Sequence, residues 1–165
     1  VFKIEGRARG PEYVYTVVTC YKEAIKAVLA GTFTEERKNE WDKRLATVFN
    51  RGFWDGYYQG QTMGEWNDHY GSLATERKVL VGKVTKYYSR LGVAEVAVQA
   101  NTFKLGDKLL ITGNATGAMY LTADEIRYDL KPVEQAEQGW LVSIPVPGKV
   151  RENDKFFKIE KVEES

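Results

Sequence analysis

The spacing of apolar residues changes once along this chain, near residue 75, and this change constrains the fold more than any other feature. Before it, apolar residues recur every three or four positions, which is the period of an amphipathic helix. After it, short β-branched runs alternate with turn residues, which is typical of an antiparallel barrel or sandwich. The sequence therefore predicts an α+β chain, with helices and a connector in residues 1–74 and a small antiparallel β-barrel in residues 75–165.

Two helices are predicted in the first part, near residues 11–30 and 34–50. Pro11 suits the first position of a helix, and Gly31 suits the left-handed residue that ends one. Thr34 is a suitable N-cap for the second helix. An irregular connector rich in Gly and aromatic residues follows from Phe53 to Leu73, and we place the domain boundary inside it.

Six β-rich runs are predicted in the second part, at residues 79–88, 93–100, 108–112, 118–129, 140–146 and 155–159. We expect six or seven strands between residues 77 and 160 and no long helix there. Alternation within the runs predicts a core of eight apolar side chains, namely Val81, Val84, Val96, Leu109, Ile111, Ile126, Val142 and Ile144.

Composition excludes several kinds of site. Lys and Arg number 24 against 23 Asp and Glu, so a charged partner must be recognised by a local patch. One Cys, Cys20, and one His, His69, exclude an intrachain disulfide, a four-ligand zinc site and a nucleophilic triad. Cys20 lies near the apolar stripe of the first helix, so we expect it to be a small buried hydrophobe. No apolar run is long enough to span a bilayer, and we expect a cytoplasmic protein without a membrane partner.

Lys3, Glu5 and Arg7 form the first candidate site. In an extended strand these three side chains share one face, while Phe2 and Ile4 share the other. At the C-terminal end of a strand in an α/β-barrel, such a trio would line the reaction chamber. The alternative is an ion-pair ladder on a solvent-exposed face, and the residues alone favour this alternative.

The second candidate site, which we call the basic hairpin, spans residues 77–90. No acid lies between Arg77 and Ala94, and the candidate residues are Arg77, Lys78, Lys83, Lys86, Tyr87, Tyr88 and Arg90. Cations that hold phosphates, beside rings on which bases stack, would suit an RNA surface. The alternative is an ordinary sheet edge, in which exposed Lys and paired Tyr side chains stabilise the hairpin.

Several segments resemble the U32 family. They are FKIEGR at 2–7, PEYV at 11–14, YKEAI at 21–25, NRGF at 50–53, GYY at 56–58, VGKV at 81–84, Gly106-Asp107 and Thr112-Gly113. The resemblance covers nearly the whole chain, and its first motif is specific. It implies that the chain is the C-terminal part of a larger enzyme, in which residues 1 to about 29 would be the last strand and last helix of a TIM-like catalytic barrel. The β-barrel that follows would resemble domain 2 of translation elongation factors.

The resemblance also implies a chemistry that this chain would not perform alone. The family is known as peptidases or collagenases, which are hydrolases, yet better-understood members hydroxylate bases of tRNA or rRNA. Those members depend on cysteines that bind an iron–sulfur cluster. Cys20 does not match these cysteines, so the cluster would be held by the missing N-terminal part, and we expect no metal or cofactor within this chain.

The role implied for this chain is accessory, as a substrate-positioning region beside its own N-terminal catalytic barrel. The substrate stays open between RNA and the peptides of a U32 peptidase, and a non-catalytic assembly module is a third alternative. The apolar stripe of the first helix would be exposed, covered by a second copy of the chain in a homodimer, or covered by the connector aromatics Trp54, Tyr57, Tyr58 and Trp66.

Overall fold

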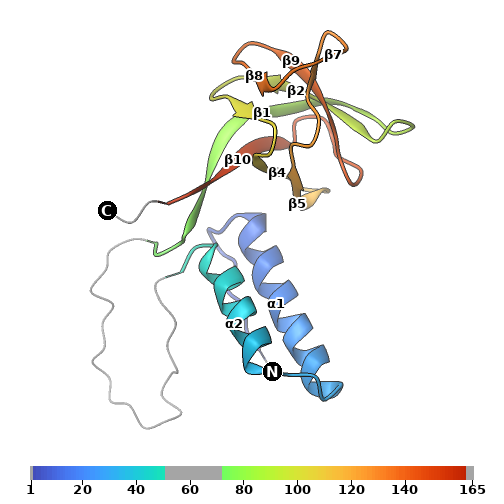
Figure 1. Ribbon diagram of the computed structural model, residues 1–165. Coiled ribbons are helices and arrows are strands. Elements are labelled where there is room, and N and C mark those ends of the chain that lie inside the picture. Colours follow the sequence, from blue (N-terminus) through green and yellow to red (C-terminus); the bar gives the residue numbers. More distant parts are fainter. Residues whose placement is uncertain (1, 51–71, 163–165) are drawn as a thin grey trace. The chain divides into compact units, whose positions relative to one another are not determined.

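The computed structural model describes residues 2–50 and 72–162 of the chain (Figure 1). Among the described residues, 2–50, 72–76 and 162 form one compact unit, the helical unit, and 77–161 form a second, the strand unit. The identities predicted for the two parts, the end of a catalytic barrel and a C-terminal barrel domain, stay predictions. His69 and most of the predicted connector, including Trp54, Tyr57, Tyr58 and Trp66, lie outside the described residues.

Two helices form most of the helical unit, as the sequence predicts. α1 (Pro11–Leu29) has Pro at its start, and α2 (Glu35–Ala46) follows Thr34. The Thr34 hydroxyl accepts a hydrogen bond from the Arg37 N–H at 3.3 Å, which confirms the predicted N-cap. Gly31 follows α1 with φ of 65°, a left-handed conformation that glycine adopts without steric cost. Local sequence signals therefore determine where both helices begin and where α1 ends.

The two helices pack side by side through a small buried cluster (Figure 1). Cys20, Ala27 and Trp41 are buried at its centre, which confirms the expected burial of Cys20. The Glu23 carboxylate accepts a hydrogen bond from the Trp41 indole N–H at 2.9 Å and two more from the Arg44 guanidinium. The hydrogen bonds from Arg44 hold the pKa of Glu23 below its usual value, and burial raises the pKa of the Cys20 thiol.

Ten strands lie in the described residues after α2. They are β1 (Glu76–Tyr88), β2 (Val93–Val98), β3 (Phe103–Lys104), β4 (Lys108–Gly113), β5 (Gly117–Thr122), β6 (Arg127–Tyr128), β7 (Lys131–Pro132), β8 (Gln135–Ala136), β9 (Leu141–Pro145) and β10 (Lys155–Lys161). Eight of them form one sheet in the order β5-β4-β10-β1-β2-β9-β6-β7, and β3 pairs with β8. Each strand pair with a defined register is antiparallel.

The α+β class is therefore confirmed, whereas closure into a barrel and the likeness to an elongation-factor domain stay predictions. The expected number of strands was too low, because β3, β7 and β8 are two-residue bridges that leave no periodicity in the sequence. The run predicted at 118–129 is divided between β5 and β6. Residues 2–6 have no regular structure among the described residues, and their predicted place as the last strand of a catalytic barrel stays a prediction.

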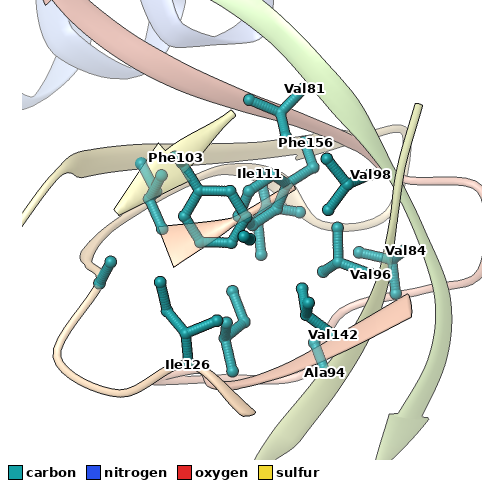
Figure 2. Packing of buried hydrophobic residues seen from close by; sticks show 14 of the residues in the cluster. Val81, Val84, Ala94, Val96, Val98, Phe103, Ile111, Ile126, Val142 and Phe156 are labelled. Carbon is teal, nitrogen blue, oxygen red and sulfur yellow. The ribbon is translucent and has the colours of Figure 1, made fainter. Parts of the chain in front are cut away.

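One apolar core fills the strand unit. All eight side chains predicted for it are buried, with at most 1% of their surface exposed. Figure 2 shows several of them converging from different strands, with Val84 from β1 and Val96 from β2 on neighbouring strands. Phe103 and Phe156 add two rings whose centres lie 5.3 Å apart. Alternation in the sequence was sufficient to predict this face of the sheet because its period is two residues.

Two turns of the strand unit have the same geometry. The turns are Lys104–Asp107 and Arg151–Asp154. In each turn, the backbone N–H of the Asp donates a hydrogen bond to the backbone carbonyl of the first residue at 3.1 Å. The Asp carboxylate accepts a hydrogen bond from the backbone N–H of that first residue, at 2.9 Å in the first turn and at 2.8 Å in the second. The third residue has a positive φ in both, 84° at Gly106 and 67° at Asn153. Each Asp thus ends a turn and starts an apolar strand, β4 or β10.

Candidate functional site

A tight turn from Gly6 to Arg9 precedes α1. The Arg9 N–H donates to the Gly6 carbonyl at 3.0 Å, and Ala8 has φ of 59° at the third position, where glycine is usual. An alanine in this left-handed conformation costs about 1–2 kcal/mol. A Cβ on Gly6 would lie only 2.9 Å from a methyl carbon of Val14, so the turn packs closely on α1. The turn therefore fixes the positions from which Arg7 and Arg9 extend.

A pocket of about 430 Å³ lies beside this turn, within the helical unit. Its polar lining comes from the turn region, from α1 and from the residues after α2, and comprises Glu5, Arg7, Arg9, Tyr13 and Asn50. Apolar and aromatic side chains complete the lining, among them Phe49. Small-molecule sites typically have volumes of roughly 300–1,000 Å³ and combine an apolar wall with a few polar groups. This pocket has that size and that composition.

The two arginines differ in how they are held. The guanidinium carbon of Arg9 lies 3.4 Å from the centre of the Phe49 ring, a cation–π contact that fixes its plane. Arg7 donates its backbone N–H to the Glu5 carboxylate at 3.0 Å. Within residues 2–50 and 72–162, neither guanidinium donates a hydrogen bond or forms an ion pair. Both therefore present N–H donors that nothing in the described part of the chain uses.

The structure places two of the three predicted N-terminal site residues at this pocket. Glu5 and Arg7 line it, whereas Lys3 does not. Their predicted role as the lining of a catalytic chamber stays a prediction. Arg9 and Tyr13 were missed by the sequence reasoning, although the alternation of Arg with small residues at Gly6-Arg7-Ala8-Arg9-Gly10 is a signal that could have indicated Arg9.

The basic hairpin, residues 77–90, comprises β1 from Arg77 onward and the start of the turn that leads to β2, with which β1 pairs. Its register is interrupted between Val84 and Lys86, so that Thr85 is an extra residue in β1. Because of this bulge, Val84 and Tyr87 both pack on the core, while Lys86 is exposed. Tyr87 is thus half-buried against the core, and its predicted role as a platform for a base stays a prediction.

Two cations at the start of β1 are used within the sheet. Arg77 forms an ion pair with Glu160 of β10 at 2.9 Å, and Lys158 forms another with the same carboxylate at 2.9 Å. Hydrogen bonds from Lys158 and Arg77 lower the pKa of Glu160. The Lys78 ammonium lies 5.2 Å from the centre of the Phe157 ring. Strand pairing therefore brings Glu160, 83 residues away from Arg77 in the sequence, to the start of β1.

Three cations of the basic hairpin have no carboxylate partner among the described residues, namely Lys83, Lys86 and Arg90. The Lys83 ammonium donates to the Asn153 side-chain oxygen at 3.2 Å, and the Lys86 ammonium lies 5.0 Å from the centre of the Tyr88 ring. Arg90 is exposed in the turn after β1. These three side chains are the part of the basic hairpin that is available to an anionic partner.

Glu95 of β2 lies opposite Lys86 in the sheet. Its carboxylate accepts hydrogen bonds from the Thr85 hydroxyl at 2.7 Å and from the Tyr88 hydroxyl at 3.2 Å. Both carboxylate oxygens are thus occupied by hydroxyl groups rather than by the Lys86 ammonium. This arrangement holds the Tyr88 ring in place beside Lys86.

The residues of this chain do not fit an iron–sulfur cluster. Such a cluster is held by several Cys thiolates, and the chain contains only Cys20, which is buried between the helices. In the described ranges, no three His, Cys, Asp or Glu side chains gather in a way that could hold a metal ion. Neither α1 nor α2 is long and apolar enough to cross a membrane, and these are the helices of the described residues.

A family model matches the N-terminal part of this chain. Residues 1–68 match the family model described as "Peptidase family U32". This match confirms the resemblance that the N-terminal motifs indicated, and residues 1–68 are U32-family sequence.

Two curated relatives extend the similarity. The chain is 58% identical over 164 residues, 99% of its length, to a protein of Porphyromonas gingivalis strain W83 named "Collagenase". It is 33% identical over 108 residues, 65% of its length, to the "tRNA hydroxylation protein P" of Haemophilus influenzae. The aligned region spans 40% of the first relative and 23% of the second. The chain therefore corresponds to less than half of the length of these relatives.

A solved structure also matches part of the chain. It is the crystal structure of the C-terminal domain of a Geobacillus thermoleovorans protein named "putative U32 peptidase", which is 20% identical to this chain in the matched part and superimposes with a TM-score of 0.46. The match covers 48% of this chain and 90% of that domain.

Proposed function

We propose that this chain is the C-terminal, substrate-positioning region of a U32-family enzyme that acts on RNA. The observation that carries the proposal is the group of three cations on the basic hairpin, Lys83, Lys86 and Arg90, that no carboxylate of the described chain neutralises. Cations placed in this way attract phosphates, and the release of counterions from the nucleic acid then favours binding. The name of the Haemophilus influenzae relative, a tRNA hydroxylation protein, supports tRNA as the RNA.

The basic hairpin would position RNA rather than read its sequence. Lysine and arginine contacts to phosphates carry no base information by themselves. The Tyr88 ring, held by Glu95 and next to Lys86, is the one aromatic side chain of the predicted surface that could stack on an unpaired base. Catalysis would occur elsewhere, in an N-terminal barrel with an iron–sulfur cluster, and the whole enzyme would work in the cytoplasm.

The salt dependence of RNA binding tests this proposal. In the full-length protein, changing Lys83, Lys86 and Arg90 to Ala should flatten the slope of log affinity against log salt by about one unit per lost phosphate contact. A matched control removes the same charge elsewhere in the strand unit, with Lys104, Lys131 and Lys149 changed to Ala, which are all exposed. The proposal predicts that the control keeps the parent slope. Equal slopes for the parent and the hairpin variant would contradict it.

A peptidase is the second candidate, and the Porphyromonas gingivalis relative named "Collagenase" favours it through its 58% identity. In that case the strand unit would hold an unfolded peptide chain, and the three cations would be a solvated sheet edge. The two candidates are distinguished by a competition experiment with the full-length protein. Denatured collagen should displace bound tRNA only if both use the same surface, and cleavage of collagen by protein free of contaminating protease would support the peptidase.

A further inference from the structure

We propose that the pocket of the helical unit binds a single nucleotide, with its phosphate held between Arg7 and Arg9. The pocket and its two guanidinium groups are independent of the function proposed above, whereas the choice of a nucleotide over another anion rests on that function. The site lies outside the basic hairpin and uses none of its residues.

The first argument is the availability of the two guanidinium groups. Both Arg7 and Arg9 line the pocket, and neither has an acceptor among the described residues. Guanidinium groups bind phosphate and carboxylate through pairs of parallel N–H donors. The Phe49 ring covers one face of the Arg9 guanidinium, and the N–H donors lie in the plane of the group, so this contact orients Arg9 without using its donors.

The second argument is the strained turn between the two arginines. Ala8 occupies a left-handed conformation at a position where glycine would be unstrained. Backbone strain of this kind persists where the surroundings maintain it, and it is found preferentially at binding and catalytic sites. Ala8 is one of five described non-glycine residues with a positive φ, and it is the residue that separates the two pocket arginines.

The third argument is the remainder of the lining, which matches the other parts of a nucleotide. Tyr13 is half-buried at the pocket and offers a ring for a base. The Glu5 carboxylate accepts one backbone N–H and can still accept hydrogen bonds from ribose hydroxyls. Two cations and one acid leave a positive balance in the lining, which suits an anionic ligand.

Binding of small probes to the full 165-residue chain tests the proposal. Isothermal titration is carried out with the four ribonucleoside 5′-monophosphates, with the corresponding nucleosides, with inorganic phosphate and with N-acetyl-phenylalanine. We expect saturable binding of the monophosphates, and weaker binding of the nucleosides and of inorganic phosphate. Arg7→Gln and Arg9→Gln should each weaken binding about tenfold or more, because each removes charge-assisted hydrogen bonds. Lys3→Gln removes a cation outside the pocket and should leave the affinity unchanged.

Three results would overturn the proposal. They are the absence of saturable monophosphate binding, an equal loss in Lys3→Gln and Arg7→Gln, and binding of N-acetyl-phenylalanine or inorganic phosphate as tight as that of a nucleotide. Circular dichroism identifies any glutamine variant that fails to fold. For such a variant, Arg7→Lys or Arg9→Lys keeps the charge and loses the paired donors, so it should still weaken binding. The salt slope with intact RNA depends on the basic hairpin, so failure of this proposal and failure of the proposed function give different results.

Discussion

The two equivalent turns of the strand unit allow the contribution of one buried carboxylate to be measured against a matched control. Asp154 is 5% exposed, and its carboxylate accepts hydrogen bonds from the Arg151 N–H and the Thr116 hydroxyl. Asp107 has the same turn geometry but is more exposed, and its carboxylate accepts the Lys104 N–H. The two substitutions Asp154→Ala and Asp107→Ala therefore differ mainly in burial and in one additional hydrogen bond.

The expected magnitudes follow from these contacts. Hydrogen bonds to a charged group contribute about 1.5–3 kcal/mol each, and donors left unpaired in a buried place add to the loss. Asp154→Ala should lower the free energy of unfolding by about 3 kcal/mol, because two such bonds are lost. Asp107→Ala should lower it by about 1 kcal/mol, since water can replace the lost acceptor at an exposed site.

Urea unfolding at equilibrium, followed by circular dichroism, measures both changes. The slope of the unfolding free energy against urea should stay the same, because the area exposed on unfolding does not change. Equal losses in the two variants would refute the reasoning that burial and the Thr116 contact distinguish Asp154. A loss below about 1 kcal/mol for Asp154→Ala would refute it as well.

Three further predictions concern the helical unit and the whole chain. Ala8→Gly relieves the left-handed backbone at φ 59° and should raise the free energy of unfolding by about 1 kcal/mol, measured by urea unfolding; a loss of stability would show that the turn is not strained. The pKa of Glu23 is lower in the folded chain than its usual value. The ion pair of Glu23 therefore stabilises the fold when the pH is above the usual glutamate pKa, and this stability is lost as the pH falls through the lower pKa of the folded chain. Glu23→Gln should therefore destabilise the chain at neutral pH, and the difference from the parent should shrink in melting curves recorded at progressively acidic pH; a difference independent of pH would contradict this. The purified chain should cleave neither gelatin nor casein in zymography, because it lacks a nucleophile paired with a base. It should also bind no iron in metal analysis, because it lacks a set of thiolate ligands. Activity that persists through stringent purification would overturn this prediction.

The sequence predicted the features that depend on neighbouring residues. Both helices, the N-cap at Thr34 and the left-handed Gly31 follow from short-range signals. The eight core positions follow from the period of two along each strand. These features need no knowledge of which strand pairs with which, and for that reason they could be predicted.

The features that depend on distant residues could not be predicted. Arg77 pairs with Glu160, which lies 83 residues away in the sequence, because the position of β10 beside β1 brings that acid to it. The bulge at Thr85 turns Tyr87 toward the core, against which it is half-buried, and no local signal distinguishes Tyr87 from Tyr88. At the other candidate site, the left-handed conformation of Ala8 determines the pocket lining, and alanine is not a residue from which such a conformation is expected.

The central claim is that the available cations of the basic hairpin contact RNA, and protection of individual lysines from acetylation tests it most directly. The full-length protein is acetylated with and without tRNA, and the modified lysines are located by mass spectrometry. The account predicts that tRNA protects Lys83 and Lys86, while Lys104 and Lys149, exposed elsewhere in the strand unit, react at the same rate in both samples. Equal reactivity of Lys83 and Lys86 with and without tRNA would contradict the account, and so would protection by denatured collagen in place of tRNA.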